Sequence, residues 1–208
     1  MENDYKSGQS YDQWKKNYQS EQTLNQLMAS KVLDPTFDFK TLELIHIGPG
    51  EKYFSRFGHV LMRFQGSSRE KPENDLTVSF MIDANDFDFS NWAGFFGGKY
   101  AIYPLIQTMK QVHDHYKEDQ NRSLSGYNIQ FNPKTKEALI RNLRQFIQNP
   151  KLLGTYAMLD NSCTNGLNKY LLDSGFEIKN IDQKVIFPKD LLELWKIQGL
   201  ITDSPSNY

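Results

Sequence analysis

Cysteine is the residue type with the greatest chemical consequence in this chain, and it occurs once, at Cys163. Leu167, Tyr170 and Leu171 follow it at helical spacing, so we expect a helix to begin at or just after the cysteine. A thiol in the first turn of a helix faces unpaired N–H groups and the positive end of the helix dipole, and both favour the thiolate. Cys163 is therefore a candidate nucleophile. The alternative is a small buried hydrophobic residue, the usual state of an unpaired cysteine.

A histidine and an aspartate occur where they could activate that thiol. His59 opens an apolar run, 59–64, and a polar loop separates this run from a second one, 76–82. The two runs predict an antiparallel hairpin, in which the start of the first strand lies beside the end of the second. Asp83 follows the second run, so we expect its carboxylate beside His59, where it would fix the tautomer and orientation of the imidazole. Together with Cys163, the chain then holds the three residue types of thiol catalysis.

Hydrophobic periodicity and turn residues predict the elements that must bring these residues together. The predicted strands cover residues 41–47, 59–64, 76–82, 100–106 and 126–131, and the predicted helices cover residues 11–32, 107–116, 134–148, 163–173 and 188–199. This pattern indicates an α+β fold, an antiparallel sheet with helices packed on one side. We expect a single domain over residues 11–201, with flexible tails at 1–10 and 202–208.

Composition fits one compact domain and excludes some classes of function. The 208 residues are 38% hydrophobic and 13% aromatic, enough for a sizeable core. The net charge is −1 and no basic stripe interleaves with aromatic residues, so we expect no nucleic-acid partner. No run reaches the ~20 apolar residues that a membrane span needs, and the first residues have no signal-peptide pattern. The protein is therefore either cytosolic or a mature or trimmed form.

Further candidates for substrate binding lie around the three residues. Arg63 would share a strand face with His59 and could meet a phosphate or carboxylate, although a salt-bridged arginine is the alternative. Asn161 and Ser162 directly precede the cysteine. An aromatic and glycine-rich segment either covers the core beneath a loop or forms an apolar wall or membrane-facing lip for an acyl chain. Its candidate residues are Phe87, Phe89, Trp92, Phe95 and Phe96. No histidine cluster has metal-ligand spacing, so we expect no metal and no other cofactor.

Several motifs carry a resemblance to known families. Gly58-His59 at a strand start, with Met81-Ile82-Asp83-Ala84 closing the next strand, resembles the histidine half of papain-like NlpC-type domains. Here the cysteine comes last, as in circularly permuted members of that superfamily. A closer resemblance spans about residues 42 to 175, and its motifs in chain order are Ile47-Gly48-Pro49-Gly50, Arg56-Phe57-Gly58-His59, Phe87-Asp88-Phe89, Phe95-Phe96-Gly97-Gly98-Lys99-Tyr100, Arg122-Ser123 and Ser162-Cys163-Thr164. Together they resemble the N-terminal periplasmic domain of the Lnb-type lipoprotein N-acyltransferases.

This resemblance implies a fold, a location and a reaction. The fold would be a circularly permuted papain-like (NlpC-type) domain, and the location the periplasm or cell envelope. The reaction would be acyl transfer through a cysteine thioester, from a phospholipid to an amine acceptor such as a lipoprotein N-terminus. The family cysteine falls on Cys163, the histidine on His59 and the orienting residue on Asp83. The chain departs from the family in two places, since Ser162 replaces an asparagine and Asp83 is an acid where an asparagine is usual.

Other functions remain open at this point. A Cys-His-Asp site makes the chain a thiol acyltransferase if the acceptor is an amine and a hydrolase if it is water. The same residues would serve a cysteine amidase or peptidase acting on cell-wall peptides. The third possibility is a module that binds a lipid or peptide without turnover. The partners expected from the first interpretation are a phospholipid or another acylated substrate, and a membrane surface or lipoprotein.

Overall fold

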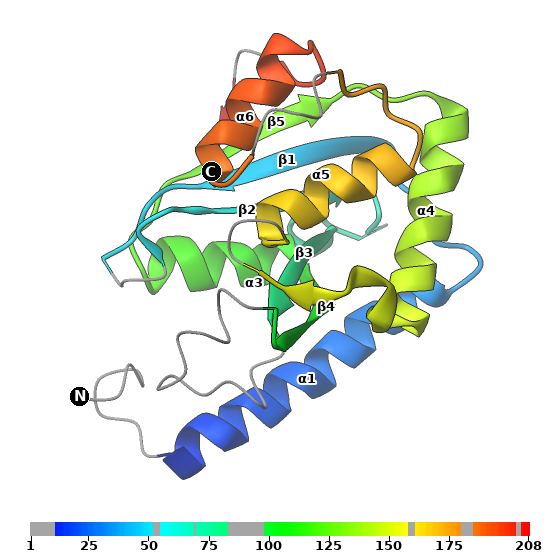
Figure 1. Ribbon diagram of the computed structural model, residues 1–208. Coiled ribbons are helices and arrows are strands. Elements are labelled where there is room, and N and C mark those ends of the chain that lie inside the picture. Colours follow the sequence, from blue (N-terminus) through cyan, green and yellow to red (C-terminus); the bar gives the residue numbers. More distant parts are fainter. Residues whose placement is uncertain are drawn as a thin grey trace.

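The computed structural model (Figure 1) describes most of the chain, and for residues 11–19 it describes the backbone alone. The described ranges are residues 11–51, 55–68, 70–82, 98–157, 161–179, 185–202 and 205–208. Within them, the helices are α1 (Tyr11–Leu33), α3 (Met109–His113), α4 (Pro133–Gln148), α5 (Cys163–Asp173) and α6 (Pro188–Ile197). The strands are β1 (Thr41–Ile47), β2 (His59–Gln65), β3 (Leu76–Ile82), β4 (Tyr100–Thr108), β5 (Leu124–Ile129), β6 (Thr155–Tyr156) and β7 (Ser206–Asn207).

A seven-stranded antiparallel sheet forms the centre of the molecule, in the order β6-β4-β3-β2-β1-β5-β7. The α+β class and the antiparallel sheet predicted from the sequence are confirmed. β2 pairs with β1 along its whole length, from Ile47 opposite His59 to Thr41 opposite Gln65. The ladder between β2 and β3 is shorter and begins at Met62. The first residues of β2 are therefore paired with β1 on one edge, and the described β3 ladder does not reach their other edge.

Apolar side chains fill both faces of this sheet, because successive strand residues point to opposite sides. The larger core holds Val60, Met62 and Phe64 of β2 together with residues of α1, α4, α5 and α6. The smaller core lies on the opposite face and holds Leu61 of β2, with Met109 of α3. Helices on one side alone were expected, and this is wrong, because α3 and the π-helix that follows it, Asp114–Glu118, cover the second face.

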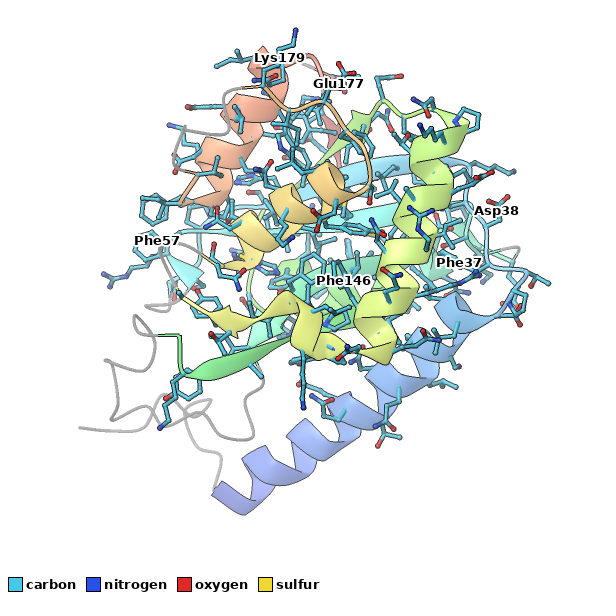
Figure 2. The ribbon with its side chains drawn as sticks, turned by 45° about the vertical axis from the view of Figure 1, so that its right-hand side comes forward. Phe37, Asp38, Phe57, Phe146, Glu177 and Lys179 are labelled. Atoms are coloured by element: carbon cyan, nitrogen blue, oxygen red, sulfur yellow. The ribbon has the colours of Figure 1, made fainter. Side chains whose placement is uncertain are left out.

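Helix α5 lies against the sheet between α4 and α6 (Figure 1). Leu167, Tyr170 and Leu171, whose spacing predicted this helix, are fully buried in the larger core. The Tyr170 hydroxyl donates to the Leu139 carbonyl of α4 at 2.7 Å. Figure 2 shows Phe146 of α4 in the interior of the view, where its ring meets that of Tyr170 at a centroid distance of 6.0 Å. The position of α5, and so of its first residue, is fixed by packing along its buried face.

The last described residues form part of the sheet. They were expected to belong to a flexible tail, and this is wrong, since Ser206 and Asn207 pair with Gly126 and Ser125 of β5. Tyr208 then packs against the smaller core, and its hydroxyl donates to the Glu43 carboxylate at 2.6 Å. The contacts that hold this segment are cross-strand hydrogen bonds and one partly buried aromatic side chain, neither of which leaves a periodic sequence pattern.

Candidate active site

The candidate nucleophile and base occupy the first positions of two elements that pack together. Cys163 is the first residue of α5 and His59 is the first residue of β2. α5 packs on β2 and β3. The backbone amide of Val60, the residue after His59, lies close enough to the Cys163 sulfur to favour the thiolate. The β2–β3 ladder begins at Met62, so His59 and Val60 lie before its first pair.

Burial dominates the state of the thiol. Cys163 is half-buried and free of any disulfide. Burial raises the pKa of the Cys163 thiol, while the Thr164 hydroxyl at 3.8 Å and the amides of Val60, Thr164 and Cys163 itself act in the opposite direction. The expected stabilisation by a helix N-terminus is present, but the loss of hydration is larger. The direction of this shift favours a neutral thiol over the thiolate expected at a helix N-terminus.

His59 is also held in its uncharged form. Its side chain is 9% exposed, and its Nε2 atom is buried without a hydrogen-bond partner. Burial lowers the pKa of His59 to about 3, and the nearby charges of Arg122 and His115 add to this. No hydrogen bond joins His59 to Cys163 among the described contacts. The resting site therefore presents a neutral thiol and a neutral imidazole whose Nε2 is unoccupied.

Two further residues form a column behind the histidine. The Tyr116 ring lies 6.0 Å from the His59 ring, tilted by 31°. The Arg122 guanidinium lies over the Tyr116 ring, 5.0 Å from its centroid. Burial raises the pKa of Tyr116 to about 12, with Cys163 among the smaller causes, so the thiol lies near this column. Sequence reasoning gave Tyr116 no role, and Arg122 entered only as part of a family motif.

Close backbone packing explains the glycine motifs before the histidine. The Gly48 N–H donates to the Ser123 carbonyl at 2.8 Å, and the Arg122 Nε–H donates to the Gly48 carbonyl at 2.7 Å. Gly58 has a φ of +80°, and a Cβ there would lie 2.8 Å from the Ile47 carbonyl oxygen. Glycine is the residue that tolerates this left-handed geometry. These motif residues therefore meet in space and fix where β2 begins.

The two residues before the cysteine have different roles. The Asn161 side chain donates to the carbonyls of Leu153 and Thr155, both at 2.9 Å, so it braces the turn that enters α5. Ser162 is 5% exposed and occupies the N-cap position, yet its hydroxyl makes no capping bond and has no partner. Asn161 is thus a positioning residue in this structure. Ser162 keeps a free hydroxyl next to Cys163.

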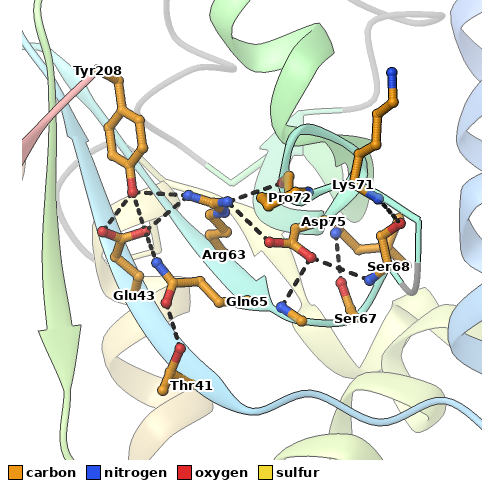
Figure 3. Close-up of polar contacts among 12 residues, drawn as sticks. Thr41, Glu43, Arg63, Gln65, Ser67, Ser68, Lys71, Pro72, Asp75 and Tyr208 are labelled. Carbon is orange, nitrogen blue, oxygen red and sulfur yellow. Dashed lines mark hydrogen bonds and ion pairs between the residues drawn. The ribbon is translucent and has the colours of Figure 1, made fainter.

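Arg63, a candidate for substrate binding, instead forms a structural ion-pair network (Figure 3). Its guanidinium donates to the Asp75 carboxylate at 2.9 Å and to the Tyr208 hydroxyl at 2.8 Å, and lies 3.5 Å from the Glu43 carboxylate. It shares a sheet face with His59, as predicted, but four strand residues, roughly 13 Å, separate the two positions. The alternative stated from the sequence, a salt-bridged arginine, describes this residue.

The remaining predicted site residues lie outside the described part of the chain. They are Asp83, Phe87, Phe89, Trp92, Phe95 and Phe96. The orienting aspartate and the aromatic acyl-chain wall therefore stay predictions. The described residues do include an aromatic pair of which one ring is exposed and close to His59 in the chain. Phe57, two residues before His59, is 42% exposed and stacks on Phe187 at 4.8 Å, and it lies at the margin of the molecule in Figure 2.

Two searches of the described residues bear on cofactors and membranes. Over those residues, no group of three or more His, Cys, Asp or Glu side chains is placed to hold a metal ion. Over the same ranges, no helix has both the length and the apolar character that crossing a bilayer requires.

These observations define an α+β domain with an antiparallel sheet, in which a cysteine begins a helix that packs on the strand begun by a histidine. The chain belongs to the Lnb N-terminal periplasmic domain family, whose sequence model matches residues 29–196. The match runs from α1 into α6 and confirms the resemblance drawn from the motifs, and with it the periplasmic character of the domain. No curated protein and no solved structure matches the chain.

Proposed function

We propose that this domain catalyses thiol-dependent acyl transfer, with Cys163 as nucleophile and His59 as general base. The observation that carries the proposal is the contact between the start of α5 and the start of β2, where the amide of Val60 meets the Cys163 sulfur. His59 has an Nε2 atom without a partner, Cys163 a free thiol and Ser162 a hydroxyl without a partner. We further propose that the domain is a circularly permuted papain-like fold, since the histidine strand precedes the cysteine helix.

The neutral resting pair sets the order of proton movements. As the Cys163 sulfur attacks an ester carbonyl, the new S–C bond forms while the thiol proton moves to Nε2 of His59. The first N–H groups of α5 would hold the developing oxyanion. When the tetrahedral intermediate collapses, the C–O bond of the ester breaks and the leaving alkoxide takes the proton from His59. The product is an acyl-thioester on Cys163 and a released alcohol.

The second half of the reaction repeats this pattern. An amine attacks the thioester carbonyl, the N–C bond forms and the S–C bond breaks, and the amine proton returns through His59 to the sulfur. Asp83, in its predicted place beside the histidine, would stabilise the imidazolium of both half-reactions. Phospholipid as acyl donor and a lipoprotein N-terminus as amine acceptor are supported by the family and by the exposed ring of Phe57 stacked on Phe187, a surface suited to acyl chains.

A second function has an observation in its favour. The pKa of Cys163 is raised and that of His59 is lowered to about 3, which is the state of a site that holds a ligand without activating its thiol. A non-catalytic lipid- or peptide-binding module is the rival candidate. An amidase acting on cell-wall peptides would use the same residues as the transferase, and only its substrate would distinguish the two functions.

The test is capture of the thioester. Protein is incubated with phospholipid carrying labelled acyl chains, and its intact mass is measured before and after hydroxylamine, which cleaves thioesters. We expect an acyl adduct that is absent in Cys163→Ala and forms at least ~100-fold more slowly in His59→Ala, the usual loss for a general base. His113→Ala is the matched control, because His113 is an imidazole on α3 outside the site.

Three results would redirect the proposal. An adduct that persists in Cys163→Ala removes the nucleophile. Release of peptide fragments from cell-wall material, with no acyl adduct, identifies an amidase. Equal lipid binding by wild type and Cys163→Ala, with no turnover of any donor, identifies the binding module.

A further inference from the structure

The protein buries two arginines, and their surroundings differ. Arg63 and Arg122 are 6% and 5% exposed. Burying a guanidinium is costly unless its charge is paired. The chain meets this cost at Arg63 with the carboxylates of Asp75 and Glu43. This network shows what a purely structural buried arginine looks like in this protein.

Arg122 has no such compensation. Its Nε–H donates to the Gly48 carbonyl at 2.7 Å and its Nη1 donates to the Gln120 side-chain oxygen at 3.2 Å, so both partners are neutral. Its third contact is the Tyr116 ring. Its Nη2 atom is buried and has no hydrogen-bond partner. Within the described ranges, no carboxylate forms an ion pair with Arg122, which leaves a buried positive charge with unused N–H donors.

This charge lies within the candidate active site. The Tyr116 ring is a neighbour of both groups, since its centroid lies 5.0 Å from the Arg122 guanidinium and 6.0 Å from the His59 ring. The charge of Arg122 helps to lower the pKa of His59, and Cys163 is among the causes that raise the pKa of Tyr116. Three buried polar atoms of this region lack partners: Nη2 of Arg122, Nε2 of His59 and Oγ of Ser162.

We propose that Arg122 binds the phosphate group of the acyl donor, with Nη2 as the hydrogen-bond donor, so that the site selects phospholipids over uncharged acyl esters. This inference rests on the proposed function, because it names the chemical class of the donor used at the same site. Guanidinium N–H groups form short, strong hydrogen bonds with phosphate oxygens. Seclusion from water strengthens that attraction, and the arriving anion neutralises the buried charge.

The spacing fits a glycerophospholipid. In such a lipid, one glycerol unit separates the phosphate from the acyl esters. In the protein, Arg122 and His59 are neighbours of the same aromatic ring, Tyr116. A phosphate held at Arg122 would therefore hold an ester carbonyl in the neighbourhood of His59 and Cys163. The binding energy of the phosphate would then position the ester for attack.

The test measures binding separately from turnover. Cys163→Ala protein, which cannot form a thioester, is titrated by calorimetry with dihexanoylphosphatidylglycerol below its micelle concentration, with dihexanoylglycerol, and with inorganic phosphate. The titrations are repeated with Arg122→Gln and Arg122→Lys in the same background. Arg144→Gln is the matched control, since Arg144 also donates to two backbone carbonyls, those of Val32 and Asp34, on another part of the molecule.

We expect Arg122→Gln to weaken phosphatidylglycerol binding by about 10-fold to 100-fold, the range for one lost hydrogen bond to a charged group. Arg122→Lys should recover part of this loss. Dihexanoylglycerol should bind weakly and with the same affinity in all variants. Arg144→Gln should bind the phospholipid as the Cys163→Ala parent does. Thermal melting of each variant shows whether it is folded, and the lysine variant keeps the test open if the glutamine variant is not.

Equal loss of both lipids in folded Arg122→Gln would overturn the proposal, since it would make Arg122 a structural residue. Phospholipid binding unchanged in both Arg122 variants would overturn it as well. Inorganic phosphate binding as tightly as the phospholipid would replace the lipid headgroup with free phosphate as the ligand. The proposed reaction fails separately: phosphate-dependent lipid binding without any acyl adduct in wild type would leave the Arg122 site standing and remove acyl transfer.

Discussion

At the scale of single residues, Cys163 and His59 are both removed from water, and this burial shifts their pKa values in opposite directions. Burial disfavours the charged form of any group, so it raises the pKa of the thiol and lowers that of the imidazole. A pair shifted this way does not exist as an ion pair at rest. If it reacts, the proton must move together with the attack on the substrate.

The thiol should therefore react slowly at neutral pH. Alkylation of Cys163 by iodoacetamide should become faster with rising pH and show no plateau below the ordinary thiol pKa of ~8.5, because the thiolate is the reacting species. The rate is measured from pH 5 to 10 by intact mass. A plateau near pH 6 that disappears in His59→Ala would show instead that an ion pair exists at rest.

The stability of the protein in acid tests the protonation state of His59. The unfolded chain binds a proton on His59 below about pH 6.5, whereas the folded protein does not bind one until its pKa of about 3. The unfolded state therefore binds more protons between these values, so this imidazole makes the folded protein less stable as pH falls. A full proton corresponds to about 1.4 kcal/mol per pH unit.

Urea unfolding of wild type and His59→Phe from pH 8 to 4 measures this contribution. As the pH falls, the free energy of unfolding should decrease more steeply in wild type than in His59→Phe, with a slope difference of up to one bound proton. Near pH 8 the two curves should be parallel, because His59 is neutral in both the folded and the unfolded state. The pKa of His46 is also lowered by burial, and it remains in both proteins, so the difference isolates His59. Parallel curves over the whole range would mean that His59 is not buried as described.

At the scale of elements, the position of α5 depends on a glycine. Gly166 has its backbone against the Phe80 ring of β3, and a Cβ there would lie 3.0 Å from that ring. Alanine favours helices over glycine by about 1 kcal/mol, but overpacking a core costs typically 1–3 kcal/mol. We expect Gly166→Ala to be destabilising by about 1 kcal/mol overall, and to shift α5 and its cysteine away from β2.

Chemical unfolding and Cys163 alkylation of this variant check both parts of the expectation. Gly199→Ala is not a matched control, since Gly199 has a φ of +67° and is strained by any side chain. Asn165→Ala serves better, because it changes the preceding residue of the same helix turn, which is less buried than Gly166. A Gly166→Ala protein more stable than wild type would show that the ring of Phe80 yields easily.

The elements also show which parts of the molecule the sequence could predict. β1 and β3 were predicted with the observed bounds, 41–47 and 76–82, because each is an apolar run closed by turn residues. β5 was placed two residues late, and the two-residue strands β6 and β7 were not predicted, since pairs of residues carry no period. The stack of Arg122, Tyr116 and His59 joins separate segments, so no local pattern records it. The neutral thiol could not be foreseen either, because burial of Cys163 depends on how α5 packs.

At the scale of the whole molecule, one buried network joins segments that are distant in the chain (Figure 3). Arg63 of β2 contacts Tyr208, next to β7, and Asp75, before β3. Glu43 of β1 completes the set by accepting from Tyr208. The network therefore connects one edge region of the sheet to the hairpin that carries His59, through charges that are shielded from water.

Removing one member of this network should be far more harmful than removing its charges together. Arg63→Met leaves the carboxylates of Glu43 and Asp75 buried without a cation, so we expect a loss of about 3–5 kcal/mol in the free energy of unfolding. The variant with Glu43→Gln and Asp75→Asn added should recover part of this loss, since no uncompensated charge remains. Urea unfolding at pH 7 measures all of these proteins, and Lys71→Met is the control, because its ion pair with Glu73 is exposed and worth little. If Arg63→Met and Lys71→Met proved equally mild, the network would have to be more hydrated than its burial indicates.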